Sequence, residues 1–203
     1  KPRTQRELAQ TLLQKEGIMR LLELREAGVT AATISRMERA GEVIRLSRGV
    51  YQLPDADLDP NHSLAEAAKR VPKGIVCLVS ALAFHRLTDQ LPPKVWMAIG
   101  PKDWAPQRSG TGIRIVRFTD ILLSEGIETQ VIEGVSVKVF GVAKTVADCF
   151  RHRGKVGQSV AIEGLQEALR QRKATPAEIA RQAEKGGVST VVRPYLEALT
   201  ANA

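Results

Sequence analysis

The first 53 residues contain three short helical patterns followed directly by two short strand patterns, an order that few folds accommodate. Thr4 and Glu7 have the capping-box spacing that begins a first helix. Apolar spacing predicts a second helix at about 19–27, and the glycine that follows it tolerates the left-handed conformation of many helix ends. Thr30 is a favourable cap for a third helix at about 31–40.

A β-hairpin pattern comes directly after these helices. Strands are predicted at 42–46 and 50–53, and the short glycine-containing loop 47–49 joins them. Two helices separated by a glycine turn and followed by a hairpin predict a winged helix-turn-helix, in which the third helix is the recognition helix.

The side chains of the third helix divide into two faces. At about 100° per residue, Ile34 and Met37 share one face, which we expect to face the core. Arg36 and Arg39 lie on the opposite face with Ala32, where they can reach guanine edges or phosphates. Thr33 and Ser35 flank that face, and Arg45 and Arg48 add charge to the wing. The predicted DNA-contacting residues are Thr30, Thr33, Ser35, Arg36, Arg39, Arg45, Ser47 and Arg48. The alternative for the arginines is an ordinary solvated helix face.

Composition supports an anionic partner. The 203 residues include 30 Lys and Arg against 22 Asp and Glu, a net charge of +8, which points to an anionic partner, most often nucleic acid. The alternative is a basic protein that is merely soluble. No signal-peptide pattern and no apolar run long enough for a membrane span is present, so we expect a cytoplasmic protein without membrane contact. Cys77 and Cys149 are expected to be buried thiols, and a disulfide between them stays open.

The chain divides into three predicted segments. Residues 1–54 form the winged helix-turn-helix, residues 55–62 an acidic linker without periodicity, and residues 63–203 a mixed α/β domain that ends in helices. The predicted fold class is therefore α+β. Within the last segment, helices are predicted at 63–71, 80–87, 143–150, 157–172, 176–185 and 191–199, and strands at 75–79, 94–99, 113–118, 127–132 and 135–140.

Catalytic patterns are absent from the sequence. No phosphate-binding glycine loop, HExxH, CxxC or GxSxG pattern occurs, so we expect no enzymatic activity, no cofactor and no metal. The histidines and the carboxylates near the strands fit no ligand spacing, which leaves a DNA nuclease as a minor alternative. These residues are His62, His85, His152, Asp120, Glu125, Glu128 and Glu133.

A second basic patch is predicted in the last segment. Its members are Arg151, Arg153, Lys155, Arg170, Arg172 and Lys173. They follow predicted helix ends, where cations complement the helix dipole, and that role alone is one explanation. The other explanation is a positive surface for DNA phosphates or for an acidic partner protein.

Several stretches resemble AbiEi-type antitoxins. The resemblance begins with the winged helix from Gly28 to Tyr51, including the Arg48-Gly49-Val50-Tyr51 turn. It continues through 79–87, the strand around Trp96, and 140–148, where Lys-Thr-Val-Ala-Asp occurs. Together these stretches follow the order of the family over most of residues 4–150, whereas the helices from Gly157 onward match less clearly.

The resemblance implies a transcriptional regulator of a bacterial type IV toxin–antitoxin, or abortive infection, system. In that family the N-terminal domain binds inverted repeats in its own promoter and represses its operon. The C-terminal domain carries the antitoxin activity against a nucleotidyltransferase-like toxin, with which it need not form a stable complex. A solitary winged-helix transcription factor whose second domain senses a ligand or protein is the alternative, and the oligomeric state stays open.

Overall fold

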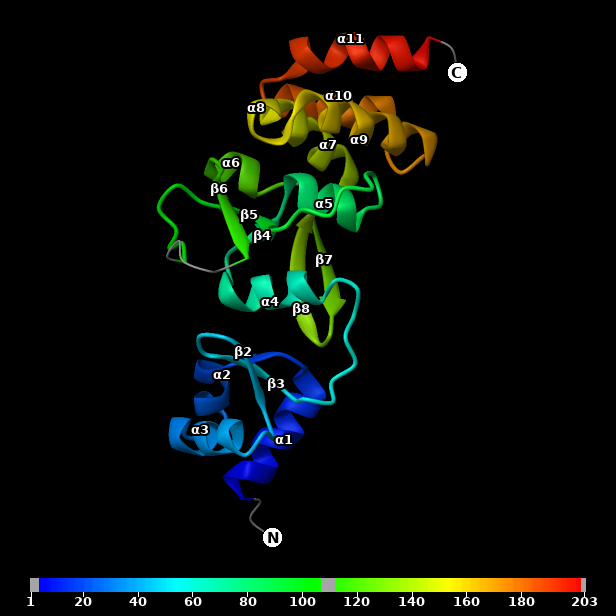
Figure 1. Cartoon of the computed structure of the whole chain (residues 1–203). Coiled ribbons are helices and arrows are strands. Elements are labelled where there is room, and N and C mark those ends of the chain that lie inside the picture. Colours follow the sequence, from blue (N-terminus) through cyan, green and yellow to red (C-terminus); the bar gives the residue numbers. More distant parts are fainter. Residues whose placement is uncertain (1–3, 107–111, 202–203) are drawn as a thin grey trace. The chain divides into compact units, whose positions relative to one another are not determined.

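The computed structural model describes residues 4–106 and 112–201 and has a mixed α+β fold (Figure 1). By their contacts, the described residues fall into two units. The first unit comprises residues 4–73, 105–106 and 129–137, and the second comprises 74–104, 112–128 and 138–201. The predicted α+β class agrees with this architecture.

The first unit contains the three predicted helices and a three-stranded antiparallel sheet of order β1-β3-β2. Its elements are α1 (Gln5–Glu16), β1 (Met19–Arg20), α2 (Leu21–Glu26), α3 (Ala31–Arg39), β2 (Ile44–Ser47), β3 (Val50–Gln52) and α4 (His62–Arg70). The prediction of one helix over 19–27 is wrong at its start. Met19 pairs with Tyr51, and Arg20 with Val50, so these two residues form a strand. Sheet pairing and the burial of Met19 outweigh a helical apolar spacing that is only a weak local preference.

The winged-helix core explains why these short elements hold together. Ile34 and Met37 of α3 are buried against Leu13 of α1 and Leu24 of α2. Both predicted helix caps are confirmed: the hydroxyl oxygen of Thr4 accepts from the Glu7 backbone in a capping box, and that of Thr30 accepts from the Thr33 backbone. The predicted core face of α3 is therefore confirmed.

Residues far along the chain complete the first unit. Glu133 and Gly134 connect the strands predicted at 127–132 and 135–140, and both residues have positive φ, 49° and 76°. A Cβ atom on Gly134 would lie 2.5 Å from the carbonyl oxygen of Glu16, so the two backbones meet with no room for a side chain. The Glu133 carboxylate accepts from the Asp59 backbone N–H at 2.6 Å and lies 2.8 Å from Nδ1 of His62.

These contacts make the first unit discontinuous in sequence. By contacts, α4 and residues 129–137 group with the winged helix rather than with the rest of 63–203. Asp59, inside the predicted linker, is anchored by its bond to Glu133. The functional division into a DNA-binding segment, a linker and an effector segment stays a prediction.

The second unit is built on a five-stranded sheet of order β6-β5-β4-β8-β7. Its strands are β4 (Ile75–Val76), β5 (Val95–Ile99), β6 (Ile113–Arg117), β7 (Ile127–Ile132) and β8 (Val135–Phe140), and residues 129–137 of the last two belong by contacts to the first unit. The strand predicted at 75–79 is shorter, because a helix already begins at Leu78. The helices are α5 (Leu78–Phe84), α6 (Asp120–Leu123), α7 (Val142–Arg151), α8 (Arg153–Val156), α9 (Gln158–Arg170), α10 (Pro176–Lys185) and α11 (Ser189–Thr200). Helices α6 and α8 were not predicted.

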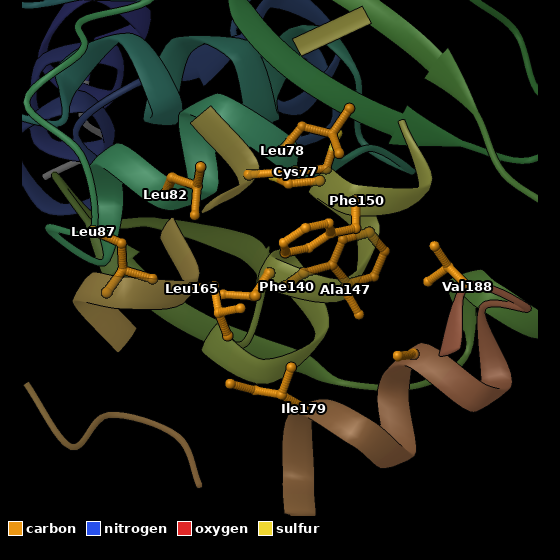
Figure 2. Packing of buried hydrophobic residues seen from close by; sticks show 14 of the residues in the cluster. Cys77, Leu78, Leu82, Leu87, Phe140, Ala147, Phe150, Leu165, Ile179 and Val188 are labelled. Atoms are coloured by element: carbon orange, nitrogen blue, oxygen red, sulfur yellow. The ribbon is translucent and has the colours of Figure 1, made fainter. Parts of the chain in front are cut away.

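Helix α7 is the centre of this unit. It contacts α5, α9, α10 and α11, and every residue from Lys144 to Phe150 is buried. Phe140 and Phe150 lie together in the apolar cluster, flanked by Leu165 of α9 and Ile179 of α10 (Figure 2). The cysteines are free and buried, as predicted. No helix in the described ranges is long and apolar enough to cross a membrane.

The core around α7 contains one ion pair. Nζ of Lys144 lies 3.0 Å from Oδ2 of Asp148, one helical turn away, and each residue is only 3% exposed. Lys144 also lies 4.4 Å from the centre of the Phe140 ring. Burial raises the pKa of Asp148 to about 6, and the attraction of Lys144 opposes that rise. Each charge therefore depends on the other for its place in the core.

We predict that Lys144→Met lowers the free energy of unfolding by about 3–5 kcal/mol, because it leaves Asp148 buried without a partner. The double variant Lys144→Met/Asp148→Leu should recover most of that loss, since it buries no charge. Urea unfolding at pH 7 measures both, with Lys138→Met on the exposed face of β8 as the control. Equal losses in the single and double variants would contradict this account.

Candidate nucleic-acid interface

The exposed face of α3 carries two arginines with a fixed direction. Nε of Arg36 donates to the carbonyl oxygen of Ala32, and Nε of Arg39 donates to that of Ser35, each at 3.3 Å. Both side chains therefore lie along the helix toward its N-terminus and remain exposed. In a winged helix, this is the end of the recognition helix that approaches base edges.

A hydrogen-bond network organises the start of α3. The side-chain oxygen of Gln5 accepts from the hydroxyl of Thr30 at 2.9 Å and from that of Thr33 at 2.7 Å. The hydroxyl oxygen of Thr33 accepts in turn from the Arg36 guanidinium at 3.3 Å. Sequence analysis did not single out Gln5, because its partners are more than twenty positions away and no local spacing connects them.

Thr33 differs from its expected place beside the exposed face. It is 6% exposed, and its hydroxyl is used inside the network. Its hydroxyl faces α1, where the side-chain oxygen of Gln5 accepts from it. Thr33 is therefore suited to hold Arg36 rather than to reach DNA itself, whereas Thr30 and Ser35 are exposed.

The wing carries the other two predicted arginines. Arg48 lies in the two-residue turn with Gly49, whose φ of 74° requires the left-handed region. Arg45 is exposed on β2, and its Nε donates to the carbonyl oxygen of Ser47 at 3.4 Å. The Ser47 hydroxyl is buried and has no hydrogen-bond partner among the described residues, so it does not present a donor to solvent.

These four arginines, like Arg25 of α2, form no ion pair among the described residues. Within the described ranges, no carboxylate lies at ion-pair distance from Arg36, Arg39, Arg45 or Arg48. Arg6 and Arg20 of the same unit, by contrast, pair with Glu42 and Glu23. The recognition helix and wing thus present positive charge that the protein does not neutralise, which favours an anionic partner.

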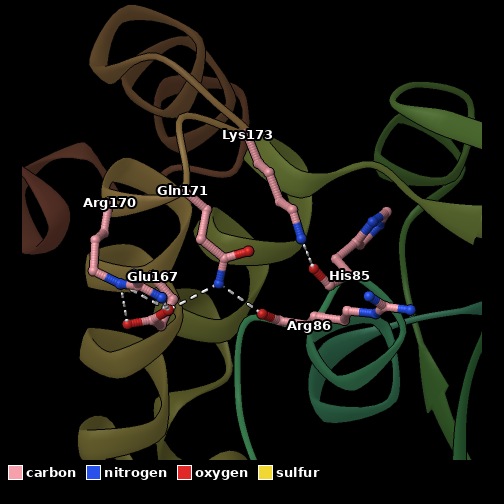
Figure 3. A network of polar contacts seen from close by, with 6 residues as sticks. All are labelled: His85, Arg86, Glu167, Arg170, Gln171 and Lys173. Carbon is pink, nitrogen blue, oxygen red and sulfur yellow. Dashed lines mark hydrogen bonds and ion pairs between the residues drawn. The ribbon is translucent and has the colours of Figure 1, made fainter.

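The structure uses most of the second basic patch internally. The Arg151 guanidinium donates to the Gly186 carbonyl at the end of α10, and Arg153 donates to the Phe150 carbonyl at 3.0 Å. Arg170 pairs with Glu167 at 2.6 Å, and Lys173 donates to the His85 carbonyl at 2.5 Å (Figure 3). The bonds of Arg151, Arg153 and Lys173 to carbonyl oxygens match the helix-end explanation for three of the six residues, whereas Arg170 is held by an ion pair. Lys155 and Arg172 are exposed and make no such bond among the described residues.

Apart from His62 and Glu133, which lie 2.8 Å apart, the histidines and carboxylates considered for catalysis are dispersed. Nε2 of His85 lies 2.7 Å from the carbonyl oxygen of Phe140, and Glu125 pairs with Lys185. His152 packs against Phe118, and burial lowers its pKa to about 4. Asp120 lies on α6 and Glu128 on β7. Within the described ranges, no group of three or more His, Cys, Asp or Glu residues is arranged to hold a metal ion.

The winged-helix segment is similar to a known protein family. Residues 6–54 match the family model of a transcriptional regulator, AbiEi antitoxin. The match covers α1 to β3 and confirms the resemblance that the winged-helix residues indicated. The AbiEi-type segment therefore contains all eight predicted DNA-contacting residues, although the match does not test their roles.

The fold of the whole chain is similar to a solved structure. This is the crystal structure of the RV2827C protein from Mycobacterium tuberculosis, with a TM-score of 0.59 and 14% sequence identity. The similarity covers 99% of this chain and 82% of that chain. At this identity the likeness shows the fold alone, and it supports the α+β class. No curated protein matches the sequence.

We predict that Thr33→Val weakens DNA binding about fivefold, since the lost hydroxyl removes one hydrogen bond that holds Arg36. Gel-shift titration of full-length protein measures the effect. Thr11→Val, which removes an exposed threonine hydroxyl from α1, is the matched control.

A double-mutant cycle decides whether Thr33 acts through Arg36. In an Arg36→Ala background, Thr33→Val should have little further effect. Full additivity of the two losses would show that Thr33 does not act by positioning Arg36.

Proposed function

We propose that the protein is a DNA-binding autorepressor and antitoxin of a type IV toxin–antitoxin system, acting in the cytoplasm and without catalytic activity. The observation that carries the proposal is the set of four exposed, unpaired arginines on α3 and the wing, within the segment that matches AbiEi-type regulators. In this proposal, the ligand is double-stranded DNA with inverted repeats in the protein's own promoter.

The arginines have distinct places in the proposed complex. Arg36 and Arg39 lie in the major groove, where a guanidinium can bond a guanine edge in a bidentate manner. Arg45 and Arg48 contact phosphates or the adjacent minor groove from the wing. Thr30 and Ser35 flank the helix start, where small side chains allow close approach of the backbone to DNA.

The antitoxin activity is assigned to residues 63–203, and its target is a nucleotidyltransferase-like toxin. This part of the proposal rests on the family match, because the described surface includes no feature specific to such a partner. A growth-rescue assay with the toxin gene tests it separately from DNA binding. A variant that no longer binds DNA but still rescues growth from the toxin would show that the two activities depend on different surfaces.

We predict that Arg36→Ala and Arg39→Ala each lower affinity for promoter DNA by about 1–3 kcal/mol if each contacts a base. Full-length protein is titrated in a gel shift at physiological salt with excess nonspecific competitor. Arg181→Ala, an exposed arginine of α10, is the control and should bind as the wild type does. Unchanged affinity in both α3 variants would refute the proposed interface.

The second basic patch is proposed as a source of additional phosphate contacts, chiefly through Arg172. Replacement of one phosphate-contacting cation reduces the slope of log affinity against log salt by about 0.9. We predict that reduction for Arg172→Gln, and a smaller one for Arg153→Gln, whose guanidinium already bonds a helix carbonyl. A slope equal to that of the wild type for Arg172→Gln would exclude it from the contact surface.

A further inference from the structure

The second unit contains a cavity of about 480 Å³ beside the edge strand β6, formed wholly by residues of that unit. Its volume lies within the range of about 300–1,000 Å³ that is usual for small-molecule sites. The walls are apolar side chains from α5, α8 and the segment before β5, including Val79, Val156 and the consecutive prolines Pro92 and Pro93. Two consecutive prolines restrict the backbone of that wall, so this side of the cavity is preformed.

Strand register places a cation in the cavity lining. β5 and β6 are parallel, and their register sets Arg114 directly opposite Trp96. The guanidinium carbon of Arg114 lies 4.0 Å from the centre of the Trp96 ring. Trp96 is itself held, because its backbone N–H donates to the Ser80 hydroxyl at 2.9 Å. The ring therefore positions the guanidinium without using its hydrogen-bond donors.

Three unpaired cations surround this cavity. Lys94, Arg114 and Lys155 all line it, and the lining includes no carboxylate. None of the three side chains forms an ion pair or a hydrogen bond within the part of the chain that the structure describes. Arg117, on the same strand, shows the contrast: its guanidinium donates to the carbonyl oxygens of Gly100 and Pro101.

The charged side chains close to the cavity are also positive. His152 stands next to α8, and its pKa is lowered to about 4, first by burial and then by the positive charges of Lys155, Arg151 and Lys144. Like charges around one cavity repel one another, so a bound anion would relieve that repulsion. The apolar walls at the same time favour a ligand with an apolar body.

We propose that this cavity binds a small organic anion, one that carries one or two negative charges on a planar or apolar body. Arg114, Lys94 and Lys155 bind the anionic group, and the wall of Val79, Pro92 and Pro93 contacts the body. The site uses none of the predicted DNA-contacting residues of α3 and the wing, and of the second basic patch it uses only Lys155. It is therefore a binding site separate from the winged helix.

The probe for this test is 8-anilinonaphthalene-1-sulfonate, which joins an apolar aromatic body to one anionic group. Its uncharged parent, N-phenyl-1-naphthylamine, has the same body without the sulfonate. We predict saturable one-site binding of the sulfonate to the folded full-length protein by fluorescence titration and calorimetry. Binding of the uncharged parent should be about tenfold weaker, because three partly exposed cations each add a modest attraction.

Variants locate the site. The triple variant Lys94→Gln/Arg114→Gln/Lys155→Gln should bind the sulfonate about tenfold more weakly than the wild type. The matched control is Lys102→Gln/Lys138→Gln/Arg181→Gln, which removes three exposed cations from the same unit and leaves the cavity lining intact. Circular dichroism and the thermal midpoint confirm that both variants are folded.

The indole of Trp96 supplies a residue-specific readout. The sequence has two tryptophans, Trp96 and Trp104, so Trp104→Phe leaves Trp96 as the sole indole. The sulfonate should shift the indole N–H resonance of Trp96 in a nitrogen–proton correlation spectrum, with the same concentration dependence as the fluorescence.

Four outcomes would overturn the proposal. They are the absence of saturable binding, equal binding of the uncharged parent, equal loss in the two triple variants, and no shift of the Trp96 indole. A cavity variant that loses affinity for promoter DNA while it binds the sulfonate normally would show that these cations contact phosphates instead. Normal promoter binding by the cavity variant, with weakened sulfonate binding, supports a site separate from the winged helix.

Discussion

The burial of helix α7 is the constraint on which the second unit depends. A helix covered on nearly all sides cannot present a polar stripe to water, so its polar residues must satisfy one another. Lys144 and Asp148 do so one turn apart, and the aromatic ring of Phe140 lies against the lysine. The surrounding helices then cover α7 with apolar residues, and their own polar ends lie at the surface. This is why so many basic residues of the unit lie at helix ends and bond to carbonyl oxygens.

In the first unit, some charged residues form ion pairs and others do not. Its glutamates pair with arginines and lysines outside the recognition helix, as Glu42 does with Arg6 and Glu23 with Lys69. The arginines of α3 and the wing have no such partner among the described residues. Since Ile34 and Met37 of α3 face the core, Arg36 and Arg39 lie on the exposed side of the helix. One amphipathic pattern thus provides both the packing of α3 and the charge of the candidate interface.

Features that depend on residues close together in the sequence could be predicted, and features that depend on distant residues could not. The capping boxes, the Glu133-Gly134 turn and helix α10 follow from residues within four positions of one another, and all were predictable. Met19 and Arg20 form a strand because of partners thirty or more residues away. The burial of the Thr33 hydroxyl depends in the same way on its hydrogen bond to Gln5. The hydrogen bond of Arg151 depends on the distant carbonyl of Gly186. Exposure of arginines was predictable from helical periodicity, whereas their pairing was not, because pairing is decided by the tertiary fold.

The discontinuity of the first unit has a consequence for how such proteins exchange parts. Residues 129–137 contribute Glu133, the partner of His62, and Gly134, whose backbone meets Glu16. A single recombination point after α4 would join a winged helix from one parent to a turn from another. The two glycines at that contact, Gly17 and Gly134, tolerate no side chain, so the first parent must supply glycine at position 17 and the second parent glycine at position 134. The winged helix therefore cannot be exchanged freely by itself, because residues 129–137, more than fifty positions downstream, must match it.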